Sequence, residues 1–238
     1  MYSVNVDKLV KTSETQAESL LEITDNIIEG LGNHKAFAVL GGKVDTFKIA
    51  YNIMEKSYSN KGKLLIAGNG GSAADAEHIV GELMKGFENP RKLDTGYIKR
   101  MEAIDIEMGK VLGDNLQGGL PAIALDGHLS LSTAYMNDCE PLLCFAQQVN
   151  GFGKENDVFL AISTSGNSKN ILYAATVAKA KGMKVIGLTG VNDSKLSDMA
   201  DVTIRSSEKR TYMIQEHHLP IYHCLCLMLE ERFFGGNN

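Results

Sequence analysis

From Lys63 onward, short apolar runs alternate with longer amphipathic segments, and this alternation constrains the fold more than any other feature of the chain. The runs are rich in Val, Ile, Leu and Ala: Leu64–Ala67, Ala122–Leu125, Val158–Ile162, Val185–Leu188 and Val202–Ile204. Short, nearly continuous apolar strands separated by helices are typical of a parallel sheet that is covered on both faces. Because crossover connections are right-handed, the pattern predicts a doubly wound α/β fold.

The first 60 residues have a different pattern, with apolar residues at helical spacing and no convincing strand. Leu20, Leu21, Ile27 and Ile28 follow this spacing, and so do Val44, Phe47, Tyr51 and Met54. We predict two amphipathic helices, interrupted near 30–33 and 41–42. Residues 1–60 are therefore expected to be a helical segment that packs on the core and in an oligomer interface, before a main domain at 61–238.

Charge and hydropathy argue against two classes of partner. The formal net charge is -5, from 24 Lys and Arg and 29 Asp and Glu, and no basic run is present, so nucleic acid is not an expected partner. No apolar run approaches the roughly 20 residues that a membrane span needs. The first residues lack the layout of a signal peptide, so we expect a cytoplasmic protein.

A glycine-rich loop follows the first predicted strand and precedes a helix: Gly68-Asn69-Gly70-Gly71-Ser72. Glycines let the backbone turn sharply and let a ligand approach it closely, and the unpaired N–H groups at a helix start attract anions. The loop is neither G-x-G-x-x-G nor a Walker A loop, so no nucleotide cofactor is expected. A plain strand-to-helix turn is the alternative that this loop alone leaves open.

A second loop, after the third predicted strand, reads Ser163-Thr164-Ser165-Gly166-Asn167-Ser168 and also precedes a helix. A helix N-cap needs a single Ser or Thr, whereas this loop has four hydroxyls. Hydroxyls and backbone amides at a helix N-terminus can hold a phosphate without a lysine. The loop therefore predicts a site for a phosphomonoester, and its polar character suits a polyol.

Two groups of side chains could move protons. His78 and Glu82 are four residues apart on the helix after the first loop, which puts them on one face. Gln215, His217, His218 and His223 gather near the C-terminus. A surface His–Glu pair and a structural histidine are the alternatives to a catalytic role.

Taken together, these motifs resemble the phosphoheptose isomerases of the SIS-domain class. The resemblance rests on 68–72 with His78 and Glu82, on 163–168, and on Ile214-Gln215-Glu216 with His218 and His223, and it covers nearly the whole chain. It implies a five-stranded parallel sheet and a homotetramer with active sites between subunits. It also implies interconversion of sedoheptulose 7-phosphate and glycero-manno-heptose 7-phosphate, a step of heptose biosynthesis.

The resemblance also implies residue roles. Glu82 and His223 are the expected acid–base pair, which suits isomerisation through an enediol. The expected substrate contacts are Asn69, Gly70, Gly71, Ser72, Ser163, Thr164, Ser165, Ser168 and Gln215. Some family members hold zinc at the positions of His78, Glu82, Gln215 and His223, and such a donor set is compatible with zinc. The sequence leaves open whether zinc is bound.

The chain departs from the family pattern at four positions and in one segment. His128 stands where the family has an acidic residue, Gly86 where it has Arg and Tyr212 where it has Asp, while Pro220 lies between Gln215 and His223. Residues 92–119 are an expected insertion with a helical pattern. A lid over the site and an added oligomer contact are two interpretations of it, and we favour the contact.

Two other functions are compatible with these motifs. The altered pocket residues suit an isomerase of a different sugar phosphate. Cys224-Leu225-Cys226-Leu227 resembles the C-terminal helix of a non-catalytic adaptor of the same class, which regulates by protein contact. That branch has Asn where this chain has His223, so retention of Glu82 and His223 favours catalysis.

Overall fold

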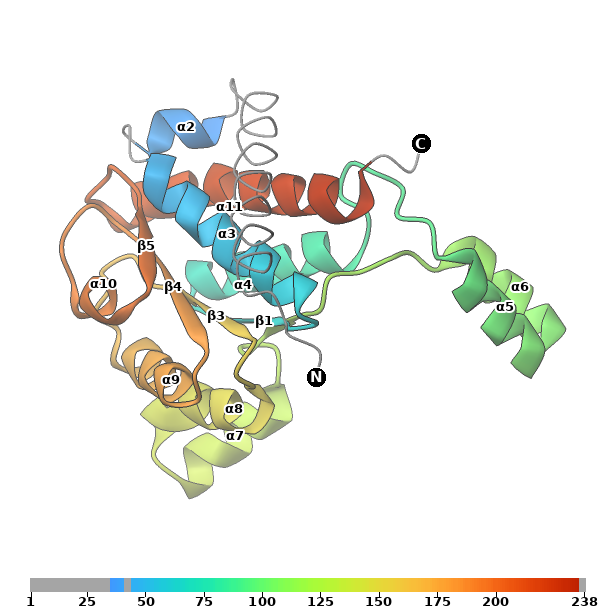
Figure 1. Ribbon diagram of the computed structural model, residues 1–238. Helices are drawn as coiled ribbons and strands as arrows, with labels where there is room; N and C mark the ends of the chain where they lie inside the picture. The colour runs from blue at the N-terminus through green and yellow to red at the C-terminus, as the bar shows by residue number, and fades with distance from the viewer. Residues whose placement is uncertain (1–34, 41–43, 236–238) are drawn as a thin grey trace, which may run out of the picture.

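A computed structural model describes residues 35–40 and 44–235. Its strands form one parallel sheet in the order β2-β1-β3-β4-β5 (Figure 1). They are β1 (Leu64–Ala67), β2 (Ala122–Ala124), β3 (Val158–Ile162), β4 (Lys184–Thr189) and β5 (Val202–Arg205). Each predicted run is a strand to within one residue at either end. The predicted doubly wound, five-stranded parallel fold is confirmed.

Helices cover both faces of the sheet (Figure 1). The first layer contains α2 (Lys35–Val39), α3 (Val44–Ser59), α4 (Gly71–Met84) and α11 (Thr211–Phe234). The second contains α8 (Cys144–Phe152), α9 (Lys169–Ala180) and α10 (Lys195–Met199). Alternate residues of β1 serve the two layers, since Leu64 and Ile66 join the first core cluster and Leu65 the second. This double burial explains why the strands are continuous apolar runs.

The strand order reverses beside β1, which pairs with β2 on one side and β3 on the other. After β1 the chain passes through α4 to β2 on one side of β1. It later crosses back to form β3 on the other side of β1. In open parallel sheets the crevice at such a reversal, at the carboxyl ends of the strands, is where ligands bind. The two predicted loops follow β1 and β3, so the topology brings both to this crevice.

The helix predicted from Val44, Phe47, Tyr51 and Met54 is α3, which buries Phe47, Tyr51 and Met54. The helical pattern before residue 35 lies outside the described residues, and so do both predicted interruptions, near 30–33 and 41–42. The interface role of segment 1–60 stays a prediction.

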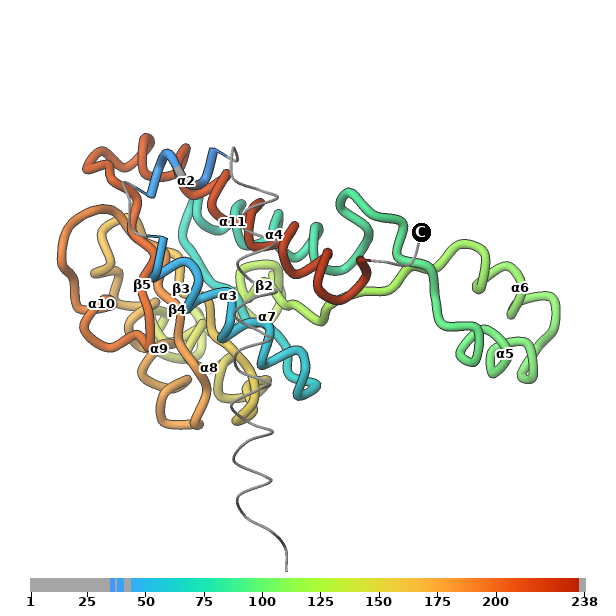
Figure 2. Tube along the Cα trace, turned by 45° about the horizontal axis from the view of Figure 1, so that its top comes forward, coloured from blue at the N-terminus to red at the C-terminus, as the bar shows by residue number. Residues whose placement is uncertain are grey.

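Within 92–119 the chain forms a helical hairpin of α5 (Thr95–Ile104) and α6 (Ile106–Asn115), which pack on each other and project from the body (Figures 1 and 2). No residue of α5 is buried, and only Gly109 is buried in α6. Ile104 is 88% exposed and Met108 65%. The backbone N–H of Gly118 donates to the carbonyl of Arg91 (2.7 Å), so the hairpin leaves and rejoins the body at one point.

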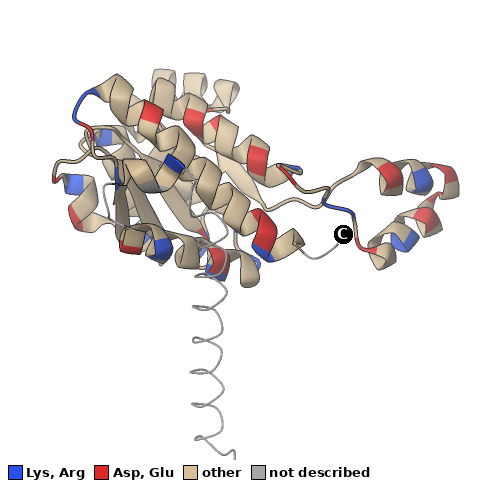
Figure 3. Ribbon diagram, turned by 90° about the horizontal axis from the view of Figure 1, so that it is seen from above, with Lys and Arg blue, Asp and Glu red and all other residues tan. Residues whose placement is uncertain are grey.

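Between β2 and β3 the chain forms α7 (Leu129–Asp138) and a 3-10 turn at Pro141–Leu143 before α8. Acidic and basic residues are interspersed along the helices in Figure 3, the hairpin included. Over the described part of the chain, every helix is too short or too polar to cross a membrane.

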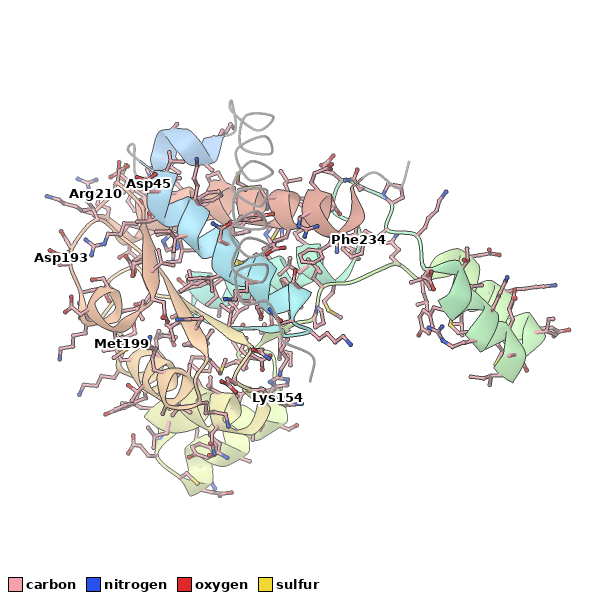
Figure 4. The ribbon with its side chains drawn as sticks, viewed as in Figure 1. Asp45, Lys154, Asp193, Met199, Arg210 and Phe234 are labelled. Atoms are coloured by element: carbon pink, nitrogen blue, oxygen red, sulfur yellow. The ribbon has the colours of Figure 1, made fainter. Side chains whose placement is uncertain are left out.

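A buried ion pair joins α4 to α11. Arg91 and Glu230 are at most 1% exposed, and the Arg91 Nε donates to the Glu230 Oε1 over 2.8 Å. The other guanidinium nitrogens donate to the carbonyls of Leu83 (2.6 Å) and Glu82 (2.8 Å) at the end of α4. Arg91 also stacks on Phe234, labelled in Figure 4 at the end of α11.

The Glu230 carboxylate accepts three further hydrogen bonds, from the backbone amides of Phe87, Glu88 and Asn89 at 2.7, 2.8 and 3.1 Å. Burial alone raises the pKa of Glu230, but these amides and Arg91 outweigh it, and the pKa is lowered. The end of α4 is thus fixed to α11 by charge and by hydrogen bonds together.

We expect removal of either partner to destabilise the fold strongly, because the other charge is then buried alone. Arg91→Met and Glu230→Leu should each lower the free energy of unfolding by about 3–5 kcal/mol. Glu230→Leu should be the more destabilising change, since three backbone amides also lose their acceptor. The double variant should lose less free energy of unfolding than the sum of the two single losses. Urea unfolding of the three variants measures these values.

Lys179→Met is the matched control, because its ion pair with Asp201 is partly exposed, with Lys179 41% accessible. Such a pair contributes less than about 1 kcal/mol. Equal midpoints for Lys179→Met and Arg91→Met would contradict a structural role for the buried pair.

Candidate active site

The two predicted loops lie side by side at the carboxyl ends of β1 and β3. The side-chain amides of Asn69 and Asn170 exchange two hydrogen bonds, of 3.1 and 2.8 Å, across them. Gly70 has φ +58°, a left-handed conformation that favours glycine, and it places α4 directly after the turn. Ser72, in the first turn of α4, is 3% exposed. The N-termini of α4 and α9 therefore converge on one crevice.

The hydroxyls of the second loop are only partly used by the protein. The Ser163 Oγ accepts from the Gly166 amide (3.1 Å) and lies 3.2 Å from the Ser168 Oγ. Ser168 is the N-cap residue of α9, yet its side chain makes no capping hydrogen bond. Ser165 accepts from the Asn167 amide (3.2 Å) and is exposed. The Ser168 hydroxyl therefore does not cap its own helix.

A polar cavity of about 330 Å³ opens beside this loop. Its lining comes from the loops after β3, β4 and β5 and from the start of α11: Thr164, Ser165, Asn167, Gly190, Asn192, Asp193, Lys209, Thr211 and Ile214. Lys209 adds a positive charge to a wall of hydroxyls and amides. In Figure 4, Asp193 and Arg210 mark this carboxyl edge, and Lys154 marks the opposite edge.

A larger cavity, of about 470 Å³, lies at the opposite, amino edge between α3 and the starts of β3 and β4. Its lining includes Ile49, Lys56, Asp157 and Lys184. We place the site at the carboxyl edge despite the smaller volume, because ligands of parallel α/β sheets bind there and because both predicted loops meet there.

The candidate acid–base groups gather where α4 lies against α11 (Figure 2). The His78 Nε2 is 3.2 Å from the Glu82 Oε1, and the Lys85 Nζ is 3.5 Å from the Glu82 Oε2. The ring of His223 comes from α11, with its centroid 5.0 Å from that of His78. Pro220 does not end α11, which continues to Phe234. The structure thus brings together His78, Glu82 and His223.

Gln215, on α11, lies against the glycine-rich loop. A Cβ atom added to Gly71 would lie 2.6 Å from the Gln215 Nε2, so the amide rests against the first residue of α4. Any side chain at position 71 would displace it. Gln215 therefore borders the convergent helix N-termini, as a substrate contact requires.

The other C-terminal histidines serve the fold. The His217 Nδ1 is 3.0 Å from the Ser206 Oγ. His218 is fully buried, with its Nε2 3.3 Å from the Thr189 carbonyl oxygen, and burial lowers its pKa to about 4. Of the three histidines at 217, 218 and 223, His223 alone faces α4.

Burial raises the pKa of three further residues that the sequence did not single out. Burial raises the pKa of Asp75 to about 6, opposed by a hydrogen bond from Tyr222 and by His78. The Tyr222 hydroxyl is also 2.9 Å from the His78 Nδ1. Burial likewise raises the pKa of Asp126, at the end of β2, to about 6, opposed by its own backbone amide. The spacing of Asp75 three residues before His78 was a usable signal; Tyr222 gave none beyond its place beside His223.

The departures from the family pattern have local partners. The His128 Nδ1 is 2.6 Å from the Gln148 Oε1, and Gln148 in turn donates to the Leu125 carbonyl. The Gly86 amide donates to the Gln117 Oε1 at 2.8 Å, beside the hairpin base. Tyr212 is 55% exposed at the start of α11.

The four predicted zinc ligands do not form a ready metal shell. Across residues 35–40 and 44–235, no three His, Cys, Asp or Glu side chains converge as metal ligands. His78 holds Tyr222 with one ring nitrogen and Glu82 with the other. Gln215 lies against Gly71. Zinc binding at these four residues stays a prediction.

Comparison with known proteins places this geometry in a family. Residues 116–190 match the SIS domain family. A phosphoheptose isomerase of Aneurinibacillus thermoaerophilus is 39% identical over 177 residues, which cover 74% of this chain and 76% of that protein. Phosphoheptose isomerase 2 of Campylobacter jejuni is 39% identical over 180 residues, 76% of this chain and 77% of that protein.

Solved structures agree with the sequence relatives. The structure of a phosphoheptose isomerase from Francisella tularensis has a TM-score of 0.66 at 30% identity and covers 96% of this chain and 100% of that chain. The corresponding structure from Neisseria gonorrhoeae has a TM-score of 0.63 at 28% identity, over 94% and 99%. With its paired hydroxyl and glycine loops and its α4–α11 cluster, the chain belongs to the phosphoheptose isomerase family of SIS-domain proteins.

Proposed function

We propose that the chain is an isomerase that interconverts sedoheptulose 7-phosphate and glycero-manno-heptose 7-phosphate. The observation that carries the proposal is that the N-termini of α4 and α9 meet across the Asn69–Asn170 bridge. One of these helices, α4, also bears Glu82. Family membership supports the same reaction, since the named relatives are phosphoheptose isomerases.

The crevice suits the phosphate end of the substrate. Ser72, Ser163, Thr164, Ser165 and Ser168 offer hydroxyls, and the starts of α4 and α9 offer unpaired amides and a favourable dipole. Asn69, Gly70, Gly71 and Gln215 border the same crevice. We assign the phosphate and the neighbouring sugar hydroxyls to these nine residues.

Glu82 is the proposed carbon base. In the direction from ketose to aldose, Glu82 removes a proton from C1 while an acid protonates the C2 oxygen, which gives the enediol. Loss of the C1 hydroxyl proton and return of the carried proton to C2 then give the aldose, so no net proton is gained. A carboxylate that is 13% exposed, next to the cation of Lys85, is suited to this shuttle.

His223 is the proposed acid and base at the two oxygens. The centroid of its ring lies 5.0 Å from that of His78, which pairs with Glu82, and 5.4 Å from that of Phe87. An imidazole can donate to one oxygen and accept from its neighbour, as the enediol step requires.

Assembly, metal and location complete the proposal. We propose a cytoplasmic homotetramer with segment 1–60 in its interface and with residues 61–238 as the SIS domain. The insertion 92–119 would add an oligomer contact through exposed apolar residues such as Ile104 and Met108. Bound zinc, held by His78, Glu82, Gln215 and His223, would polarise the substrate carbonyl.

The activity test is a coupled assay of purified protein with sedoheptulose 7-phosphate and other five- to seven-carbon sugar phosphates. We expect turnover of the heptose phosphate. Glu82→Gln and His223→Asn should each lower kcat by about 10²–10⁴-fold, because general acid–base groups contribute that much. The assay is run after chelation and with added zinc.

The outcomes separate the three candidate functions. Turnover of a different sugar phosphate, lost in the same variants, would reassign the substrate. Binding without turnover of any sugar would favour the regulatory adaptor. Zinc-dependent turnover would support the metal version of the site.

For the phosphate contact we expect Ser168→Ala to raise KM about tenfold and to change kcat less, because one hydrogen bond to a charged group contributes about 1.5 kcal/mol. Thr176→Ala is the matched control on α9, since that exposed hydroxyl donates to the Leu172 carbonyl of its own helix. Equal KM values for the two variants would argue against the phosphate role of Ser168.

For the insertion we expect a smaller oligomer with unchanged kinetics when residues 93–116 are replaced by a short Gly-Ser linker. The body should stay folded, because Arg91 and Gly118 already meet at the hairpin base. Light scattering gives the oligomer size and the coupled assay gives kcat and KM. An unchanged oligomer with an altered KM would support the lid instead.

A further inference from the structure

Two glycines let the helices of the α5–α6 hairpin approach each other closely. A Cβ atom added to Gly109 would clash with the backbone of Glu102, and one added to Gly113 would lie 2.7 Å from the Ile98 Cγ2. The later glycine of α6 therefore meets the earlier residue of α5, so the two helices run antiparallel. These contacts also fix which sides of α5 and α6 meet.

The larger apolar residues of the hairpin lie beside this contact, on one face. With 3.6 residues per turn, apolar residues of both helices fall on the same flank of the glycine contacts. We call this surface the hairpin face, and its residues are Tyr97, Met101, Ile104, Met108 and Leu112. Met101 is partly buried and the other four are exposed.

A projecting hairpin of this size needs a partner for that face. Isolated helices shorter than about 12–15 residues are marginal in water, and α5 and α6 have 10 residues each. The two glycines lower the helix propensity of α6 further. Figures 1 and 2 show the hairpin clear of the sheet and of the helices that cover the sheet, so the described body of the same chain does not cover the hairpin face.

The charges at the edges of the hairpin face indicate what covers it. Arg100 lies at the outer edge of α5, with its guanidinium 5.5 Å from the centre of the Tyr97 ring. Helical spacing places Glu107 and Asp114 at the outer edge of α6. The two glycine contacts set Arg100 at a height between these two acids. One edge of the face is therefore basic and the other is acidic.

We propose that the hairpin face binds the hairpin face of a second copy of this chain, with α5 of each copy over α6 of the other. A two-fold axis parallel to the helices produces this arrangement, and the basic edge of each copy then meets the acidic edge of the other. A two-fold axis across the helices would stack α5 on α5 and bring the two Arg100 side chains together, which is unfavourable. The pairing rests on the oligomer contact of the proposed function, for which it names the partner surface.

The size of the face sets the strength of this contact. A stable interface has about 20–30 residues on each side, whereas the hairpin offers a few apolar residues and the charges beside them. The contact therefore adds to an assembly that other segments also hold. Its loss should shift dissociation to a higher protein concentration rather than unfold the chain.

The first test is light scattering of the full chain over a dilution series. Met108→Lys puts an unpaired charge into the hairpin face, so it should raise the dissociation constant of the oligomer at least about tenfold. Ala103→Lys is the matched control, because helical spacing places that exposed residue on the opposite face, and its dissociation constant should stay within about twofold of wild type. Both variants should keep the wild-type urea midpoint. Equal dissociation constants for the two variants overturn the proposal.

Charge reversal tests which helices pair. Arg100→Glu makes both edges acidic, and Glu107→Arg combined with Asp114→Arg makes both edges basic. Each of these variants alone should associate about fivefold more weakly than wild type, and an equal mixture should recover the wild-type dissociation constant. An Arg100→Glu chain that associates as tightly as wild type, or a mixture no tighter than its components, overturns the pairing of α5 with α6.

The coupled assay on the same samples separates this proposal from the proposed function. If wild-type protein does not turn over sedoheptulose 7-phosphate but the oligomers respond as expected, the isomerase proposal fails and the hairpin pairing stands. If replacement of 93–116 shrinks the oligomer while Met108→Lys and Arg100→Glu do not, the oligomer contact stands and the hairpin pairing is overturned. An altered KM of Met108→Lys with an unchanged oligomer also overturns it, in favour of a lid.

Discussion

The buried Arg91–Glu230 pair is the interaction on which the site depends most. Every proposed proton-transfer group lies on α4 or α11, and neither helix orients the other through regular backbone bonding. Arg91 donates to the carbonyls of Glu82 and Leu83 in α4 and to the carboxylate of Glu230 on α11. The backbone of the proposed base is thus held directly by the ion pair that fixes the distance between the two helices.

The sheet supplies the other half of the site by a different physical means. Strand order alone brings the loops after β1 and β3 together, and the Asn69–Asn170 amides close the gap. The proposed phosphate contacts are therefore placed by topology and helix ends, whereas the proposed proton-transfer groups are placed by side-chain packing between two helices. Because α4 begins at the first loop and carries Glu82 farther along, it joins both halves.

The sequence predicted the fold well because the strands are buried on both faces, so Leu64–Ala67 and Val158–Ile162 are apolar throughout. The loop hydroxyls and the His78–Glu82 spacing were equally visible, since they are local patterns. Tyr222, Asp75 and Arg91 were missed because their partners are distant in sequence or on another helix. His218 shows the reverse: its clustering suggested chemistry, but its burial at Thr189 makes it part of the core.

The departures at Gly86 and His128 bear on how far this site has changed from the family pattern. The family pattern expects a cation at Gly86, and here Lys85, one residue earlier, lies 3.5 Å from Glu82. The positive charge beside the base is therefore retained by a shifted residue. At His128, where an acid is expected, the ring is held by Gln148, but Asp126 two residues earlier lies at the end of β2 with a raised pKa. In both places a neighbouring residue of the expected charge type lies within two residues of the family position.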